Sequence, residues 1–528
     1  MIRLILEAVK EWVEDTIATL ITSLGLTETF NTMPSDSILA VKLAGVSPST
    51  RYYFKTKGYY TKTDGAGGDY YVTTDAVQGS RKFVVEGTNY YLVPIDDNIS
   101  ERVNVCRLGI RPYATTSMAN VTVKASYAGT NSNYISNIYK NGTPHDFILY
   151  FPAGRFYFED TIDLTAYEMG IEGVEPARVR DELANSGLFG GGTVLCFPFL
   201  ETGEEAIRQK DGKIKNVTLV GSKSNYDFVI DRTKLTTAPD EVVTETIRKN
   251  GDNTDFINTG IYKTGSGEIV NVYVMHFWRG INALAHNIYI DNIFAKRCHV
   301  GFTFGNDIKA RGIFGWNCHT LMQVTGAIFS GVQIRIDSCV HVVQITKIDG
   351  HGSIGGVTLD DVDGDWCTDS LIKIGDDTHY IEATGCVFSN IHGRCNTLKY
   401  YNASDTPPTA SNLNTSNSAG YGVIRVGNYA TFTNNRVSLN VLGNSNVEDS
   451  DSSSAQILTP PILLTFGSGG NGVKGNMFTV PAPQIATASD VAKVLQFGTE
   501  NGTSARIDTA LNTYFVKGSN VIPIKAES

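Results

Sequence analysis

The sequence predicts an all-β protein whose main part is a parallel β-helix. Three observations lead to this fold class. Short strand-like segments recur every 20–28 residues over about residues 273–401, cysteines hold the equivalent place in most of them, and turn residues separate them. A repeat of this length without helical periodicity is the signature of a solenoid built from short strands.

The composition favours the same fold class. The chain has 528 residues, of which 19% are charged, and it contains 52 Gly, 25 Tyr and 24 Phe. Disordered chains carry few aromatic residues and much charge, whereas short strands with tight turns need glycine, polar and aromatic residues. The net charge of −10 argues against a nucleic-acid-binding protein. No apolar run reaches the 18 residues that a membrane span needs.

The N-terminal segment is expected to be an amphipathic helix. Apolar residues recur at intervals of three and four over residues 2–24, and charged residues occupy the opposite face. Two interpretations stay open: a helix that packs on its own domain, and a short homo-oligomeric bundle. Glu7, Lys10 and Glu11 interrupt any apolar core of a signal peptide, so we expect no export signal.

We expect four regions along the chain. The helix over residues 1–30 would serve oligomerisation and attachment, and residues 31–110 would form a small β-rich region. The β-helix would occupy residues 111–485, and residues 486–528 would form a β-rich cap, because a solenoid needs its open end covered. The β-rich region is predicted from aromatic runs between glycine-rich turns, at residues 52–54, 59–60, 70–72, 83–85 and 90–92.

The cysteines set the register of the repeat. Equivalent places are held by Phe277, Cys298, Cys318, Cys339, Cys367 and Cys395. We expect these side chains to stack inside successive coils, where a free thiol behaves as a small buried hydrophobe. Metal binding is the alternative, but a stack spread over many coils does not converge on one ion. The sequence contains no CxxC pair, and we expect neither a metal nor a cofactor.

Three segments resemble a known family. Residues 151–156 (FPAGRF) and 171–173 (IEG) resemble the opening coil of the pectate-lyase-like β-helix superfamily. Residues 58–70 resemble the glycine-rich segment before the β-helix of many bacteriophage tailspikes, and residues 105–110 resemble the short strand and glycine that follow. The chain departs from the family pattern at 125–140, where the usual opening helix motif is missing or degenerate.

The resemblance implies a right-handed, single-stranded parallel β-helix in a homotrimeric virion protein. Its N-terminus would bind phage tail or baseplate proteins, and its β-helix would bind, and often cleave, a bacterial surface polysaccharide. It implies no nucleic-acid partner, no membrane span and a location on the phage tail, acting at the host cell surface.

The register assigns two outward columns, because strand alternation sends the residues two and four before each ladder position outward. The column two residues before the ladder is Met275, Lys296, Trp316, Asp337 and Asp365. The column four residues before it is Tyr273, Phe294, Phe314, Arg335 and Asp363. Aromatic residues therefore lie at one end of this face, and arginine and aspartates lie at the other.

These residue types point to glycan chemistry. Aromatic rings stack on sugars, and paired carboxylates supply the acid and the base or nucleophile of glycoside hydrolysis. We expect Asp337, Asp363 and Asp365 to be catalytic. We expect the substrate to be bound by Trp316, Arg335, Phe294, Phe314, Lys296 and Tyr273.

Several alternatives stay open at this point. A loop or a neighbouring subunit could cover Phe294 and Phe314, and residues 363–365 could form a polar turn. The protein could be a receptor-binding tailspike without activity, a structural virion protein, or a polysaccharide lyase that uses a base near an acidic sugar. His299 and His319 follow the ladder and are expected to form a polar stack rather than a catalytic pair. His351 and Asp376 lie in short strings found in polygalacturonases, in the wrong order.

Overall fold

The structure is a computed structural model. It describes the following residues: 28–44, 51–62, 67–77, 80–95, 102–113, 121–139, 147–166, 169–177, 192–231, 243–249, 257–347, 352–367, 370–375, 380–395, 424–427, 430–439, 464–466, 472–474, 476–481, 498–499, 506–507 and 513–517. Among them, no helix is both long and apolar enough to cross a membrane. The expected helix over residues 2–24 lies outside the described residues.

The chain divides into two compact units. The first comprises residues 1–174 and 178–193, and the second comprises residues 175–177 and 194–528. The first unit begins with a mixed sheet in the order β1-β2-β3-β5-β4, packed against the helix α2 (Asp36–Ala44). Its strands are β1 (Glu28–Phe30), β2 (Tyr52–Thr56), β3 (Gly68–Thr73), β4 (Arg81–Val85) and β5 (Thr88–Ile95).

Aromatic residues that alternate along the strands explain why this sheet forms a core. Phe54 and Tyr70 face one another across β2 and β3, are fully buried, and stack with a centroid distance of 5.5 Å. Four of the five expected strand runs are strands, whereas Tyr59 and Tyr60 lie in an irregular segment after β2. An ion pair of 2.7 Å between the buried Arg81 and Asp36, whose side chain is 40% exposed, ties β4 to the first turn of α2.

The rest of the first unit is the beginning of a parallel arrangement. The strands β6 (Arg102–Asn104), β7 (Phe147–Tyr150) and β10 (Met169–Glu172) pair in parallel, and β8 (Gly154–Tyr157) and β9 (Ile162–Leu164) connect them. Residues 125–140, where the opening helix motif of the family is degenerate, lie almost wholly in the helix α3 (Val121–Tyr139), so a helix forms there without that motif. One expectation is wrong here. Residues 105–108, expected to be a strand, form a 3₁₀ helix that Gly109 ends with a φ of 96°.

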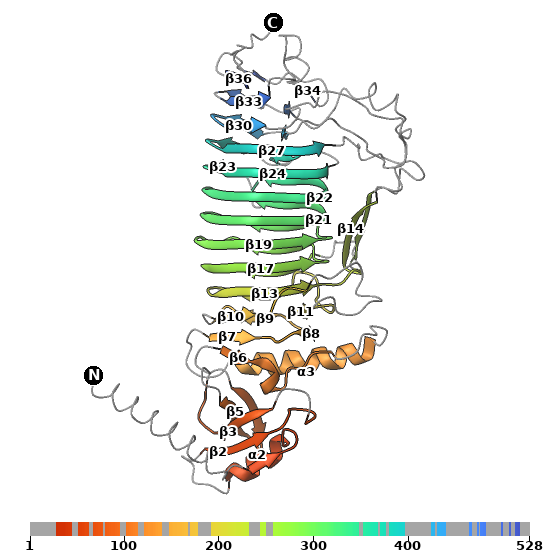
Figure 1. Ribbon diagram of the computed structural model, residues 1–528, viewed down its shortest axis with the longest axis vertical. Coiled ribbons are helices and arrows are strands. Elements are labelled where there is room, and N and C mark those ends of the chain that lie inside the picture. Colours follow the sequence, from red (N-terminus) through yellow and green to blue (C-terminus); the bar gives the residue numbers. More distant parts are fainter. Residues whose placement is uncertain are drawn as a thin grey trace, which may run out of the picture. The chain divides into compact units, whose positions relative to one another are not determined.

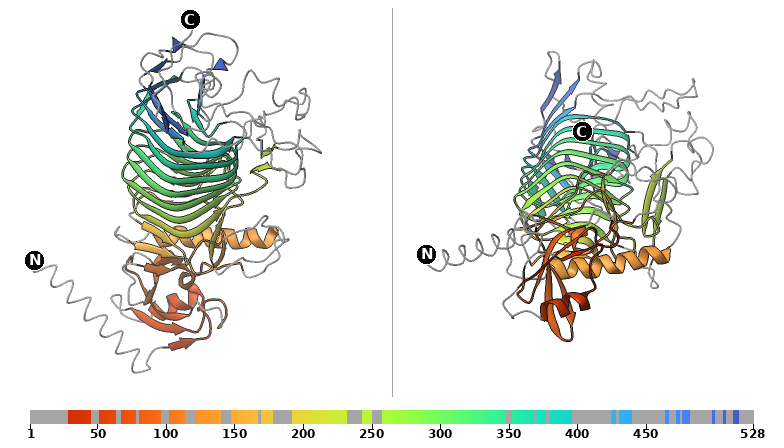
Figure 2. Two further views of the ribbon diagram at one scale, coloured as in Figure 1. Left: turned by 45° about the horizontal axis from the view of Figure 1, so that its top comes forward. Right: turned by 60° about the horizontal axis from the view of Figure 1, so that its bottom comes forward.

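The second unit is a parallel β-helix, whose stacked coils Figure 1 shows as rungs. Its coils are formed by β11 (Thr193–Cys196), β12 (Glu205–Gln209), β13 (Lys213–Val220), β16 (Thr259–Lys263), β17 (Gly267–Met275), β18 (Arg279–Ala283), β19 (Ile288–Lys296), β20 (Val300–Phe304), β21 (Ile308–Val324), β22 (Phe329–Ile345), β24 (Thr358–Cys367), β25 (Ile372–Ile374), β27 (Val387–Cys395), β28 (Ile424–Val426), β30 (Arg436–Leu439), β31 (Leu464–Phe466), β33 (Met477–Pro481), β34 (Gly498–Thr499) and β36 (Thr513–Lys517). The two views of Figure 2 look more nearly along the axis and show the curled sheet. The predicted fold class is confirmed.

Left-handed backbone corners divide the coils that contain β17, β19 and β21 into three faces. In one coil, β19 bends at Asn292 with a φ of 51°, the chain turns again at Arg297 with a φ of 54°, and β20 is followed by Asp307 with a φ of 57°. Asn and Asp tolerate this conformation better than most residues. We call these the first, second and third corners; the second face lies between the first and second corners.

Longer coils add a fourth side at the third corner. From residue 352 on, a separate parallel sheet appears in the order β23-β26-β29-β32-β35. Its strands are β23 (Gly352–Gly355), β26 (Ile381–Thr384), β29 (Ala430–Thr433), β32 (Gly472–Lys474) and β35 (Arg506–Ile507). The cysteine spacing therefore rises from 21 to 28 residues because the longer coil contains an added strand.

The cysteine ladder lies in the core as predicted. Cys298, Cys318, Cys339 and Cys367 are free thiols with no exposed surface. Cys318 pairs in register with Cys339, and Cys339 pairs with Cys367, with 3.2 Å between the last two sulfur atoms. The inward residues between the columns are buried as well, for example Ile313 and Ile334.

Candidate functional site

The two outward columns form one strip on the second face, which we call the outward strip. Each expected neighbour is a parallel partner in the structure. Tyr273, Phe294, Phe314, Arg335 and Asp363 follow one another on β17, β19, β21, β22 and β24. Met275, Lys296, Trp316, Asp337 and Asp365 do the same. The register read from the sequence is therefore correct along both columns.

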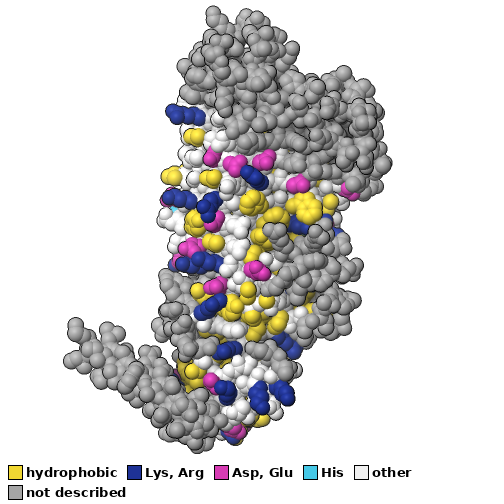
Figure 3. All heavy atoms as spheres, in the orientation of Figure 1, with side chains coloured by type: hydrophobic (Ala, Val, Ile, Leu, Met, Phe, Trp, Pro, Cys, Tyr) yellow, Lys and Arg dark blue, Asp and Glu magenta, His cyan; other side chains and the backbone are white. Residues whose placement is uncertain are grey.

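The exposure of the strip changes along its length. Asp337 is exposed, and the side chain of Arg335 is 53% exposed, whereas Phe294, Phe314 and Trp316 are half-buried. In Figure 3, charged side chains gather where the strands of the visible face begin, and apolar side chains gather where these strands end.

Lys296 was expected to be exposed on the outward face, but its side chain is almost fully buried. It is only 3% exposed, and its ammonium group lies 4.1 Å from the centroid of the Trp316 ring on the next coil. Met275, one coil earlier, is 5% exposed. Trp316, the neighbour of Lys296 in the same column, covers the Lys296 ammonium group, and this contact orients the indole ring.

The acidic end of the strip has a defined backbone. Residues 363–365 lie within the strand β24, so the alternative of a polar turn is wrong. Asp337 and Asp365 are direct partners on neighbouring strands, and parallel strands lie about 4.8 Å apart. The Asp365 side chain lies outside what the structure describes. Arg335 forms an ion pair of 3.2 Å with Asp361 at the first corner.

Ser338 contacts the Asp337 carboxylate. Its hydroxyl donates a hydrogen bond of 2.8 Å to Asp337 Oδ1. Ser338 occupies the second corner with a φ of 68° and is 2% exposed. Hydrogen-bond donation to a carboxylate favours its charged form.

A β-hairpin runs along the second corner. Its strands are β14 (Tyr226–Ile230) and β15 (Val243–Ile247), which pair antiparallel. The Ile230 amide donates to Asn317 Oδ1 at 3.2 Å, and Ile230 packs in one apolar cluster with Val340. This hairpin was not predicted from the sequence, although the alternating run at residues 226–230 is a signal for its first strand.

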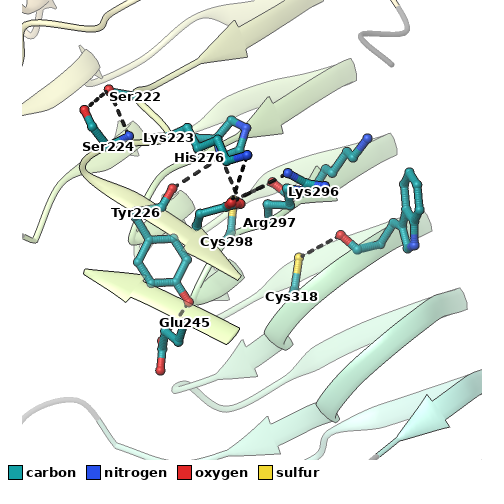
Figure 4. A network of polar contacts seen from close by, with 12 residues as sticks. Ser222, Lys223, Ser224, Tyr226, Glu245, His276, Lys296, Arg297, Cys298 and Cys318 are labelled. Carbon is teal, nitrogen blue, oxygen red and sulfur yellow. Dashed lines mark hydrogen bonds and ion pairs between the residues drawn. The ribbon is translucent and has the colours of Figure 1, made fainter. Parts of the chain in front are cut away.

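Buried polar side chains hold the first half of the hairpin in place, and Figure 4 labels His276 and Arg297 among them. Asp227 Oδ2 lies 3.6 Å from Arg297 Nη1, and Asp227 Oδ1 lies 3.4 Å from His276 Nδ1. Burial raises the pKa of the Asp227 carboxyl group, although Arg297 and Lys223 oppose this shift. Burial, and next the charge of Arg297, lowers the pKa of His276 to about 3, so this imidazole is neutral at pH 7.

Rings stack under the second half of the hairpin. Trp278 and His299 stack at 3.9 Å between centroids, and His299 and His319 stack at 4.5 Å. Glu245 on β15 lies 2.9 Å from His299 Nδ1. Burial lowers the pKa of His319 to about 3. The expectation that His299 and His319 form a stack is confirmed.

The remaining candidates yield no further geometry. His351 and Asp376 lie outside the described residues. Within the part of the chain that the structure describes, no group of three or more His, Cys, Asp or Glu side chains is arranged to hold a metal ion.

Comparisons with known proteins show what the chain is similar to. No protein-family model matches it, and no curated protein matches it. Among solved structures, the gp42 tailspike of Acinetobacter phage vb_AbaP_AS12 aligns at 10% identity with a TM-score of 0.48, over 95% of this chain and 76% of that chain. The tailspike protein of Acinetobacter phage vB_ApiP_P1 aligns at 12% identity with a TM-score of 0.36, over 95% and 76%.

A third solved structure is the enzymatically active domain of tailspike protein 2 of bacteriophage CBA120. It aligns at 11% identity with a TM-score of 0.41, over 88% of this chain. The chain spans 60% of the length of that domain. Phage tailspikes are thus among the solved structures similar to this chain.

Proposed function

We propose that the protein is a phage tailspike that binds a bacterial surface polysaccharide and depolymerises it by glycoside hydrolysis. One observation carries this proposal: aromatic residues and aspartates stand in register on one outward face of the β-helix. Phe294, Phe314 and Trp316 would contact sugar rings, and Asp337 with Asp363 or Asp365 would cleave the glycosidic bond.

The spacing of the carboxylates supports hydrolysis. The backbones of Asp337 and Asp365 lie one strand spacing apart, about 5 Å, which is close to the carboxylate separation of retaining glycosidases. Asp363 and Asp365 are two residues apart on one strand, about 7 Å, which falls in the range of inverting glycosidases. Two close carboxylates also separate their pKa values, which supplies one acid and one base.

Other residues of the strip have supporting roles in this proposal. Arg335, exposed beside the aspartates, would bind an acidic or hydroxyl group of the sugar. Lys296 would act by orienting Trp316, and Tyr273 would extend the aromatic end. We further propose a homotrimer that acts from the phage tail, with the N-terminal segment bound to tail proteins.

A panel of purified capsular and O-antigen polysaccharides tests the proposal. The protein should release new reducing ends from one member of the panel. Asp365→Asn should lower turnover about 100-fold or more and leave glycan retention intact, because acid–base catalysis contributes about 10²–10⁴-fold. Asp291→Asn, a carboxylate on the first face, is the matched control and should keep full turnover.

The same assay separates the alternative functions. Retention of a polysaccharide without release of reducing ends would identify a binding protein. Absorbance from an unsaturated uronic product would identify a lyase. If Asp337→Asn, Asp363→Asn and Asp365→Asn all keep normal turnover, the outward strip is not the active site.

A further inference from the structure

The residues of the second corner contact different partners on successive coils. On the three earlier coils the side chains of His276, Arg297 and Asn317 face β14: the first two lie against Asp227, and the third accepts a hydrogen bond from the Ile230 amide. On the fourth coil, Ser338 donates instead to Asp337 on the outward strip. The same backbone corner thus anchors the hairpin on three coils and contacts a carboxylate on the next.

We propose that Ser338 is a positioning residue that holds Asp337 as the ionised member of the catalytic pair. Asp337 would then be the base or nucleophile, and a carboxyl group on β24 would be the acid. The inference rests on the proposed function and deepens it by assigning the roles of the two carboxylates.

Local chemistry favours this assignment. When two carboxyl groups are close, one holds the proton, and the group that accepts a hydrogen bond from a donor is the one that stays charged. Ser338 is suited to fix the position of Asp337, because its own hydroxyl is buried and its backbone is set by the corner. Asp337 itself is exposed, so a substrate can reach it.

The roles give a balanced reaction. The β24 carboxyl group donates its proton to the leaving glycosidic oxygen as the C–O bond breaks. Asp337 either forms the new bond to the anomeric carbon, which water then cleaves, or takes a proton from the water that attacks that carbon.

Carbodiimide labelling tests the charge state of Asp337 without any substrate. Carbodiimides activate protonated carboxyl groups, so the labelling of Asp337 with glycine ethyl ester falls as that group ionises with rising pH. Peptide mass spectrometry would measure the pH midpoint in the wild type and in Ser338→Gly. Glycine tolerates the positive φ of this corner and lacks the hydroxymethyl side chain that carries the donating hydroxyl.

Asn317→Gly is the matched control, because Asn317 occupies the same corner one coil earlier and contacts Ile230 rather than a strip carboxylate. The other charged groups on neighbouring elements are the same in all variants: Arg335, Asp363, Asp365, Lys296 and Asp231. The midpoint should rise by about 0.5–1 unit in Ser338→Gly and stay unchanged in Asn317→Gly. An unchanged or lower midpoint in Ser338→Gly would overturn the assignment, since a protonated Asp337 that donates to Ser338 predicts a fall.

A second measurement uses the polysaccharide from which the wild type releases reducing ends. Ser338→Gly should lower kcat about tenfold, change KM less than about twofold, and move the acid limb of the pH profile upwards. Ser338→Ala provides a second variant, and equal thermal midpoints would confirm that both are folded. If Asp337→Asn, Asp363→Asn and Asp365→Asn all keep full turnover, the outward strip and this inference both fail. If Asp337→Asn keeps full turnover but a variant of Asp363 or Asp365 loses it, the strip stands and only this inference fails. If Asp337→Asn loses turnover while both Ser338 variants keep the wild-type kcat and pH profile, only the role of Ser338 is wrong.

Discussion

The ion pair between Arg297 and Asp227 under the hairpin gives a prediction about stability. It tests whether burial or hydrogen-bond geometry decides how much an ion pair contributes. Arg297→Met removes a guanidinium group that is 11% exposed and lies 3.6 Å from Asp227, whose side chain is 9% exposed. Arg311→Met removes a better-aligned group that bonds Asp291 at 2.9 and 3.2 Å but is 61% exposed. Breaking a buried pair costs about 3–5 kcal/mol, whereas an exposed pair contributes about 0–1 kcal/mol.

Two features of the site reduce the cost of Arg297→Met. Lys223 remains 3.7 Å from Asp227 Oδ2, and Asp227 can take up a proton because burial already raises the pKa of its carboxyl group. We therefore expect about 2 kcal/mol, or about 30-fold faster local opening. Arg297 opposes the rise in that pKa, so its removal raises the pKa further. The effect of Arg297→Met should therefore be larger at pH 7 than at pH 4, where the carboxyl group is protonated more often.

Hydrogen exchange is the appropriate assay, because the pair holds a local element rather than the whole β-helix. The amides of the β14–β15 ladder should exchange about 30-fold faster in Arg297→Met, and those of β21 should keep their rates. In Arg311→Met the ladder should exchange at the wild-type rate. Equal rates in the two variants would refute the reasoning that desolvated charge anchors the hairpin.

Three further predictions concern the whole molecule. A thiol reagent should label Cys106, which is partly exposed, and leave unmodified the buried ladder residues Cys298, Cys318, Cys339 and Cys367; labelling of all four in the native protein would contradict the ladder. Burial lowers the pKa of Lys263 from 10.5 to about 8, so between these pH values the folded state binds fewer protons than the unfolded state. The stability of the wild type relative to Lys263→Met should therefore rise between pH 8 and 10.5, by up to about 3 kcal/mol, and a thermal midpoint difference that does not change with pH would be the opposite result. Light scattering should give the mass of a trimer, and a stable monomer at micromolar concentration would contradict the proposed assembly.

The sequence predicted the coils well because one residue type marks successive coils. Cys318, Cys339 and Cys367 stand in register in the structure, and this fixes the neighbours on both outward columns. Alternation then gives the direction of each side chain, since a strand has a period of two residues. Direction alone does not give exposure. Lys296 points outward yet is buried, because the Trp316 ring lies over its ammonium group.

The hairpin and Ser338 could not be found by the same reasoning. Residues 226–247 are inserted between two coil strands and follow no repeat, so no other coil predicts where they pack. Their anchors, Arg297 and Asn317, follow the outward residues Lys296 and Trp316 directly, but their contacts depend on the left-handed backbone at each corner. The repeat pattern shows only that the chain passes from one face to the next at such a residue. It does not indicate which element the side chain of that residue contacts.

The position of the added residues explains why the outward columns remain in register across the change in coil length. The cysteine spacing lengthens between Cys339 and Cys367, and the added strand β23 lies beyond the third face, away from the outward strip. Asp337 and Asp365 therefore remain direct partners although 28 residues separate them. An insertion at the second face would instead have shifted the pairing, and a shift of one residue turns every side chain to the other side of the strand. The pairing of β24 with β27 has such an irregularity, between Gly364 and Cys367. The acidic end of the strip thus lies where regular pairing on the second face ends, and bulged or irregular strands are frequent next to active sites.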